Sequence, residues 1–154
     1  MAAEQRNPIT YSNPITRFAY IFKYVPSHAD IVYQILEGSQ PLTEVFDSEE
    51  AHVSCIGSGP GSDLVGILKL MLKKDKRSRL YSSLCDREST WGDSWQHIER
   101  KIQEHIDLCS EFQKIDVTSR EILQSDMKYL RADLFTLIFF VSEIYSFKKT
   151  PNIF

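Results

Sequence analysis

The stretch from Val53 to Leu64 constrains the fold of this chain more than any other. It begins with small or apolar residues up to Ile56, and glycines then occupy alternate positions at Gly57, Gly59 and Gly61. This order predicts a buried strand, a tight turn and the start of a helix. Glycine permits positive φ where the strand reverses and lets the backbone approach a ligand closely. Ligands bind at such turns in open α/β sheets, because free N–H groups of the following helix point into the turn.

The segment before the turn predicts two helices. Prolines and polar residues up to about position 14 indicate an irregular lead-in. Apolar residues at helical spacing from Ile15 to Val25 predict a first helix, which Pro26 ends. Ser27 then predicts the N-cap of a second helix that runs to about Glu37 and stops at Gly38.

A βαβ unit is predicted around the turn. A helix from about Asp63 to Lys74 follows it, with Gly66 where a neighbouring element comes close. The next strand, Leu80 to Cys85, delivers Asp86 to its carboxyl end. There the carboxylate returns beside the glycine turn and can accept both hydroxyl hydrogens of a ribose. The alternative is a surface aspartate that merely ends a strand.

In the helix from about Asp63 to Lys74, the side that faces the sheet is expected to consist of Leu64, Ile67, Leu68, Met71 and Leu72.

Three later segments complete the pattern. A helix capped by Asp93 or Ser94 continues to about Cys109, and a third strand covers Phe112 to Val117. A continuous apolar run marks Asp133 to Val141 as a central strand covered on both faces. Four strands that alternate with helical segments predict a parallel α/β sheet with right-handed crossovers.

The glycine motif resembles the first motif of class I S-adenosylmethionine-dependent methyltransferases. It reads G-x-G-x-G, with Pro60 between the second and third glycines. The dinucleotide fingerprint G-x-G-x-x-G is not matched, because position 62 is Ser62, and this argues against half of a nucleotide-dependent oxidoreductase. A plain tight turn is the structural alternative. The resemblance extends over roughly residues 15–147 and implies a Rossmann-like sheet in the order 3-2-1-4, with helices on both faces and a helical preface.

The resemblance also implies a site for S-adenosylmethionine. The turn that would cradle its amino-acid part consists of Gly57, Ser58, Gly59, Pro60 and Gly61. Asp86, with Arg87 directly after it, would bind the ribose. Asp116 and Val117 would lie against the adenine. The residues themselves leave open another role for Asp116, as the cap of a helical segment over residues 119–130.

Several aromatic residues have two interpretations. Tyr20, Tyr24 and His28 lie in the helical preface, where the resemblance implies lid residues and the residue pattern alone indicates half-buried packing aromatics. Trp91 and Trp95 either stack on a flat ring of a ligand or fill the core under a helix start.

The resemblance identifies no catalytic residue. If methyl transfer needs a base, the candidates are Glu143 and Tyr145, near the end of the fourth strand where the resemblance places the methyl-transfer pocket. A metal site is not expected. His97, Glu99, Glu104 and His105 do not share one face at a ligand spacing.

Composition limits the partners of the chain. Its 154 residues fit one core, and a net charge of -3 provides no electrostatic footprint for nucleic acid. The three cysteines lack metal-like spacing and suit a reducing compartment. The N-terminus lacks a secretory signal, and the longest apolar run, Leu134 to Val141, is too short to span a bilayer. The expectation is an intracellular protein of the cytoplasm or nucleus, without a membrane partner.

The family continues through three further strands, whereas this sequence ends at Phe154. The resemblance therefore implies a truncated form, a first half or a short form, divided into a preface over residues 1–50 and a Rossmann-like S-adenosylmethionine-binding half-domain over 51–154. A protein partner or a second copy would cover the edge of the fourth strand. The expected function is methyl transfer to an unknown acceptor. The alternative is a non-catalytic S-adenosylmethionine-binding or regulatory half-domain that pairs with another protein.

Overall fold

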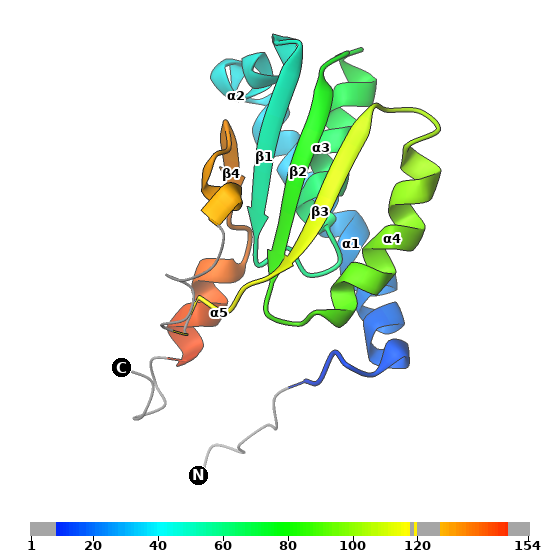
Figure 1. Ribbon diagram of the computed structural model, residues 1–154, viewed down its shortest axis with the longest axis vertical. Coiled ribbons are helices and arrows are strands. Elements are labelled where there is room, and N and C mark those ends of the chain that lie inside the picture. The colour runs from blue at the N-terminus through cyan, green and yellow to red at the C-terminus, as the bar shows by residue number, and fades with distance from the viewer. Residues whose placement is uncertain (1–8, 118, 120–126, 148–154) are drawn as a thin grey trace.

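A computed structural model describes residues 9–117, 119 and 127–147. Its four strands form one all-parallel sheet in the order β3-β2-β1-β4 (Figure 1). The strands are β1 (Glu50–Ile56), β2 (Arg79–Asp86), β3 (Leu108–Lys114) and β4 (Leu134–Thr136). Both the α/β class and the order 3-2-1-4 predicted from the sequence are confirmed.

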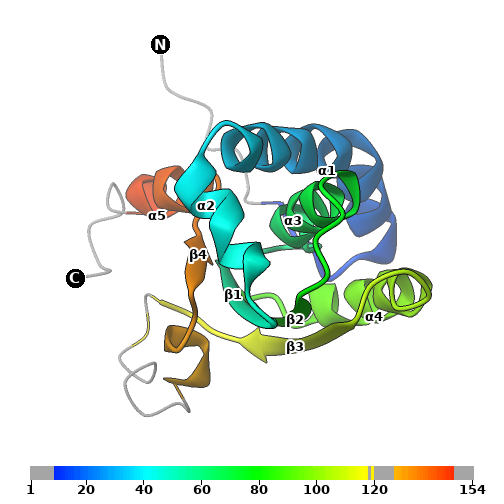
Figure 2. The ribbon, with the colours of Figure 1, turned by 90° about the horizontal axis from the view of Figure 1, so that it is seen from above.

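Helices form two layers on one face of the sheet (Figure 2). The inner layer is α3 (Ser62–Lys73) and α4 (Thr90–Ile102), and α1 (Pro14–Glu37) packs on α3 from outside. The short 3-10 helix η3 (Met127–Leu130) lies on the opposite face. The remaining elements are α2 (Gln40–Glu44), η1 (Val45–Asp47) and α5 (Phe140–Phe147). No helix in the described ranges is long and apolar enough to cross a membrane.

Helix α1 is continuous, so the expectation of two helices divided at Pro26 was wrong. Asn13 caps the start of the helix, because its side chain accepts a hydrogen bond from the Ile15 amide at 2.8 Å. Pro26 lies inside it, and Ser27 is no N-cap, because its hydroxyl donates to the Tyr24 carbonyl at 3.0 Å. A proline removes one helical hydrogen bond, and packing of the C-terminal half of α1 on α3 outweighs this loss.

The contact between α1 and α3 depends on Gly66. A Cβ at this position would lie 2.6 Å from the Ala29 carbonyl oxygen and 2.7 Å from Cβ of Val32. Ala29, Val32 and Leu36 are buried along this side of α1. The predicted close approach at Gly66 is therefore made by the preface helix.

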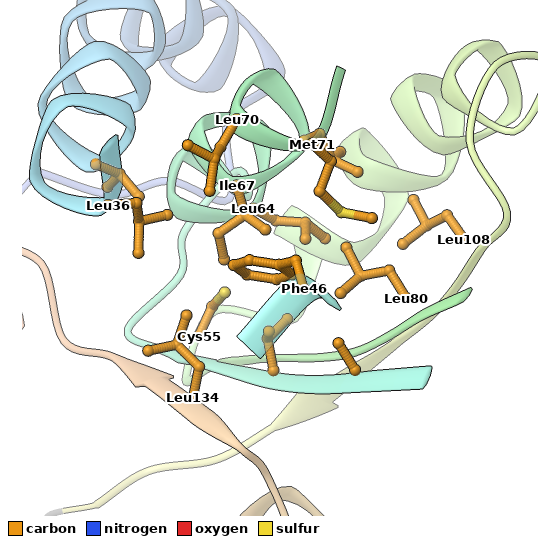
Figure 3. Packing of buried hydrophobic residues seen from close by; sticks show 14 of the residues in the cluster. Leu36, Phe46, Cys55, Leu64, Ile67, Leu70, Met71, Leu80, Leu108 and Leu134 are labelled. Atoms are coloured by element: carbon orange, nitrogen blue, oxygen red, sulfur yellow. The ribbon is translucent and has the colours of Figure 1, made fainter. Parts of the chain in front are cut away.

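The core lies between α3 and the sheet (Figure 3). The predicted face of α3 is confirmed except at Leu72, whose side chain is 60% exposed, while Leu70 is fully buried. The fully buried ring of Phe46, from η1, packs with these side chains. Cys55 and Cys85 are buried in the sheet, Cys109 is exposed, and the three form no disulfide with one another.

The expected boundaries of α4 and β3 were wrong. Helix α4 begins at Thr90, before Asp93, and Cys109 belongs to β3. Glu88 fixes this start, because its carboxylate accepts hydrogen bonds from the amide and the hydroxyl of Thr90, at 3.2 and 2.7 Å. Strand β3 ends at Lys114, which pairs with the last residue of β2, so Val117 lies beyond the strand.

The predicted long fourth strand was also wrong. Strand β4 has three residues and occupies an edge of the described sheet, where Leu134 pairs with Val53 of β1. Phe139 has a positive φ of 61°, and the chain then turns into α5. A short run of apolar residues fits a buried strand and a packed helix equally well, so the run alone could not distinguish them. The residues expected at the end of this strand, Ser142 to Tyr145, therefore lie in α5.

Candidate site at the glycine turn

The glycine turn joins β1 to α3 at the carboxyl edge of the sheet (Figure 1). Its three glycines, Gly57, Gly59 and Gly61, all have positive φ, at 70°, 49° and 84°. The amides of Gly57 and Ser58 donate to the Cys85 carbonyl in β2, at 2.8 and 3.0 Å. These bonds hold the turn against the end of the neighbouring strand.

Asp86 ends β2 directly beside this turn. Its Oδ2 accepts a hydrogen bond from the Gly59 amide and its Oδ1 accepts one from the Glu88 amide, both at 2.9 Å. Burial raises the pKa of Asp86, and the two amide hydrogen bonds act in the opposite direction. Arg87 follows with an exposed side chain. Because each carboxylate oxygen carries two lone pairs, both oxygens of Asp86 keep one acceptor position.

Two of the turn glycines make room for rings of the same chain. A Cβ at Gly57 would overlap the ring of Phe140, the first residue of α5. A Cβ at Gly61 would lie 2.6 Å from the indole of Trp95 in α4. These two glycines are therefore required by packing within the chain.

Gly59 has a different environment. The nearest atom to a Cβ built there is Nε1 of Trp91, at 3.9 Å, which is an ordinary van der Waals distance. The backbone of Gly59 is thus the part of the turn with space beside it. The Asp86 carboxylate binds the amide of this same residue.

Three buried polar side chains near the turn have no hydrogen-bond partner among the described residues. They are the hydroxyl of Ser58, Oδ2 of Asp63 and the hydroxyl of Thr136. Buried polar atoms are nearly always paired, so such a group calls for an explanation. Asp63 is the second residue of α3 and is 4% exposed. Burial raises the pKa of Asp63 to about 6, and the nearby Thr136 hydroxyl and Ile138 amide, which favour the charged form, offset only part of this rise.

The local sequence predicts Asp63 only as the start of a helix. An acidic residue two positions after the last glycine was the available signal, because helix N-termini stabilise negative charge. Its burial depends on β4, whose Thr136 comes from a distant part of the sequence. The sequence around Asp63 could not predict this contact with Thr136.

Aromatic rings from three parts of the chain form a cluster beside the turn. The centre of the Tyr20 ring in α1 lies 5.6 Å from the centre of the Trp91 ring in α4 and 4.9 Å from that of Tyr24. The ring centres of His28 in α1 and Phe139, next to α5, lie 4.4 Å apart. We call this set the ring cluster; it consists of Tyr11, Tyr20, Tyr24, His28, Trp91 and Phe139.

The structure bears on both interpretations of these aromatics. Tyr20, Tyr24 and His28 contact other rings of the chain, which confirms the packing interpretation; a lid role stays a prediction. Trp91 and Trp95 are 3% and 2% exposed and therefore fill the core.

The remaining predicted site residues lie beyond β3. The Ile115 amide donates to the Asp86 carbonyl at 2.9 Å, so the loop with Asp116 and Val117 begins beside Asp86. Val117 packs on a small buried cluster around Ile115. The Ser119 amide donates to the backbone carbonyl of Asp116, at 3.1 Å. Most of the helical segment predicted over 119–130 lies outside the described residues.

The structure adds no role for the two residues placed near a methyl-transfer pocket. Tyr145 is 63% exposed on α5, and the side chain of Glu143 is outside the described part. In the described ranges, no group of three or more His, Cys, Asp or Glu side chains is arranged to hold a metal ion.

No protein-family model matches the chain. The sequence is 26% identical to the 25S rRNA (uridine(2843)-N(3))-methyltransferase of Saccharomyces cerevisiae, over an alignment of 172 residues. The alignment covers 93% of this chain and 47% of that enzyme, so the chain spans about half the length of its relative. The similarity to a methyltransferase and the all-parallel 3-2-1-4 sheet together show that this chain has a class I methyltransferase-like fold.

Proposed function

We propose that the chain binds S-adenosylmethionine at the glycine turn and takes part in methyl transfer to a base of RNA. The cofactor proposal rests on one observation. The Asp86 carboxylate accepts a hydrogen bond from the amide of Gly59, the turn glycine that has space beside its backbone. The RNA acceptor is proposed from the relative, whose name assigns it a uridine of 25S rRNA. An RNA acceptor agrees with a location in the cytoplasm or nucleus.

The residues at the turn fit the cofactor in three respects. The open backbone at Gly59 permits close approach of a ligand. The buried Ser58 hydroxyl, which lacks a partner among the described residues, is available for a polar group of the amino-acid part. Asp86 retains two acceptor positions, which matches the two hydroxyls of a ribose. Asp116 and Val117 would then lie against the adenine, because their loop starts at the Asp86 carbonyl.

The cofactor supplies a methyl group that is already activated by a sulfonium. The protein's contribution is consequently positioning, which lowers the entropic cost of bringing donor and acceptor into line. In this chain the two hydrogen bonds of Asp86 fix its carboxylate before any ligand arrives. A carboxylate held in this way loses little freedom on binding.

The alternative proposal is a non-catalytic S-adenosylmethionine-binding or regulatory half-domain that pairs with another protein. Its supporting observation is that the alignment covers 47% of the rRNA methyltransferase. Incubation of the purified chain with S-adenosylmethionine labelled in the methyl group and with rRNA separates the two. Label in the RNA supports the enzyme, and cofactor binding without transfer supports the half-domain.

The cofactor proposal is tested by calorimetric titration with S-adenosylmethionine and S-adenosylhomocysteine. We expect micromolar binding by the parent chain and at least tenfold weaker binding by Asp86→Asn. The matched control is Asp93→Asn, an exposed aspartate on α4, which should bind like the parent. A folded parent chain that binds neither compound would contradict the proposal.

A further inference from the structure

The N-terminal half of α1 differs in charge from the rest of the chain. No acidic residue occurs between Glu4 and Asp30, whereas Arg6, Arg17 and Lys23 lie in this interval. The net charge of the whole chain is -3. The total charge therefore conceals a local segment that carries only positive charges.

The same segment exposes aromatic side chains. Phe18 and Phe22 lie one helical turn apart on α1 and are 70% and 78% exposed. The C-terminal half of α1 packs on α3, whereas the N-terminal half extends past the carboxyl edge of the sheet (Figure 1). The two rings consequently stand on the part of the helix that lies at the same end of the sheet as the glycine turn.

A cation and a partly exposed ring follow Phe22 directly in the sequence of α1, around the helix from the face that carries Phe18 and Phe22. The Lys23 ammonium lies 5.1 Å from the centre of the Tyr24 ring, and Tyr24 is 37% exposed. Tyr24 belongs to the ring cluster, which reaches Phe139, itself 52% exposed, through His28. We call Phe18, Phe22, Lys23 and Tyr24 the α1 surface. Of these residues, Tyr24 belongs to the ring cluster, which includes Trp91, the side chain nearest to Gly59.

We propose that the α1 surface binds single-stranded RNA, with bases stacked on Phe18 and Phe22 and a phosphate at Lys23. The proposal rests on the RNA acceptor proposed above. Proteins that bind single strands combine aromatic rings, on which bases stack, with cations that follow the backbone. Acidic side chains would repel the phosphates, and none occurs from residue 5 to residue 29. An apolar protein partner could pack on the same rings, but its binding would not explain why acidic residues are missing from residues 5–29.

The test measures the fluorescence anisotropy of labelled single-stranded oligouridine and of an RNA duplex, with the full chain. The key variant is Phe18→Ala/Phe22→Ala. The matched control is Ile31→Ala/Ile35→Ala, which removes two exposed apolar side chains at the same spacing from the half of α1 that carries acids. We expect the parent to prefer the single strand, the key variant to bind at least tenfold more weakly, and the control to match the parent.

Salt dependence tests the phosphate contact. Each phosphate neutralised on a single strand contributes about 0.7 to the slope of log K against log salt concentration. We expect Lys23→Gln to reduce the slope by about this amount. An unchanged slope would remove Lys23 from the proposed contact.

Two results would overturn the proposal. One is equal RNA affinity in the parent and in Phe18→Ala/Phe22→Ala. The other is self-association of the parent that this variant abolishes without a change in RNA affinity, which would make the α1 surface an interface between copies. Calorimetry with S-adenosylmethionine on the same samples keeps the two proposals apart. Ring-dependent RNA binding without cofactor binding would refute the cofactor site alone, and the reverse would refute the α1 surface alone.

Discussion

At the scale of single residues, the turn glycines serve two different purposes. Gly57 and Gly61 make room for rings of the chain, and Gly59 leaves space beside the Asp86 carboxylate. All three have positive φ, so an added side chain is strained at each. The consequences of substitution nevertheless differ, because the surroundings differ.

We expect Gly61→Ala to lower the free energy of unfolding by about 2–3 kcal/mol, since its Cβ would collide with Trp95 at a positive φ. Gly59→Ala should cost about 1 kcal/mol from backbone strain alone and should mainly weaken binding of S-adenosylmethionine. Urea unfolding and calorimetry on both variants measure the two effects. Equal losses of stability would contradict the distinction.

Asp63 makes stability depend on pH. Burial raises its pKa to about 6, whereas an aspartate in the unfolded chain titrates near 4. Between these values the folded state holds the extra proton, so stability falls as pH rises from about 4 to 6 and is then level. The cost at neutral pH is up to about 3 kcal/mol.

Asp63→Asn removes this titration, so its stability relative to the parent should increase from pH 4.5 to pH 7 by about 1–3 kcal/mol. Urea unfolding of both proteins at the two pH values checks this, and the other titrating groups cancel in the comparison. A difference that does not change with pH would mean that Asp63 is charged in the folded state over the whole range.

Some contacts of single residues at the site could be predicted from the sequence, and others could not. The place of Asp86 beside the turn followed from the spacing of a βαβ unit, because the carboxyl ends of parallel neighbours meet at one edge. The burial of Asp63 and the fit of Phe140 against Gly57 did not follow, because both depend on the segment after Leu134. Contacts between distant segments leave no periodic signal in either one.

At the scale of elements, tertiary packing decided where helices and strands begin and end. Helix α1 continues through Pro26 because residues beyond it pack on α3. Strand β3 ends where its partner β2 ends. Strands β1 and β2 and helix α3, with strong local patterns, were predicted to within a few residues. The β4–α5 segment was not, because its apolar run suits either structure.

Pro26→Ala restores an amide that can donate to the carbonyl one turn earlier in α1. We expect the free energy of unfolding to rise by about 1–3 kcal/mol, because proline inside a helix costs about 3 kcal/mol relative to alanine. The far-ultraviolet circular dichroism should hardly change, since the helix is already continuous. A large gain in helical signal would indicate that α1 is broken at Pro26 in solution.

The contact between α1 and α3 can be tested at its closest point. Gly66→Ala should lower the free energy of unfolding by about 2–3 kcal/mol, because the new Cβ meets the rigid backbone oxygen of Ala29 at 2.6 Å. Gly38→Ala is the matched control, since its φ is -76° and its Cβ would lie 3.2 Å from the Gln34 oxygen. Similar effects of the two substitutions in thermal unfolding would show that α1 shifts freely on α3.

At the scale of the whole molecule, one parallel sheet gathers the residues proposed for the cofactor and RNA at its carboxyl edge (Figure 1). The turn after β1, Asp86 at the end of β2 and the loop after β3 come from neighbouring strands. The parallel sheet was predictable from the alternation of strands and helices, and the resemblance of the glycine motif to class I methyltransferases implied the order of its strands. A ligand that bridges these three segments binds only the folded chain.

Such a ligand stabilises the fold by mass action. At one hundred times its dissociation constant, S-adenosylmethionine should add about 2.7 kcal/mol. We expect the thermal midpoint to rise by about 5–10 °C for a chain of this size. In Asp86→Asn the shift at the same concentration should be much smaller. An equal shift in parent and variant would place the ligand elsewhere.

The rings that fill the glycine turn have a consequence for synthesis on the ribosome. The turn itself is complete by Gly61, but Trp95 and Phe140, which pack against it, are translated much later. A nascent chain shorter than about residue 140 therefore carries the glycine motif without its packed surroundings. The N-terminal segments emerge first, and the glycine turn acquires its packed surroundings only after Phe140 has been synthesised.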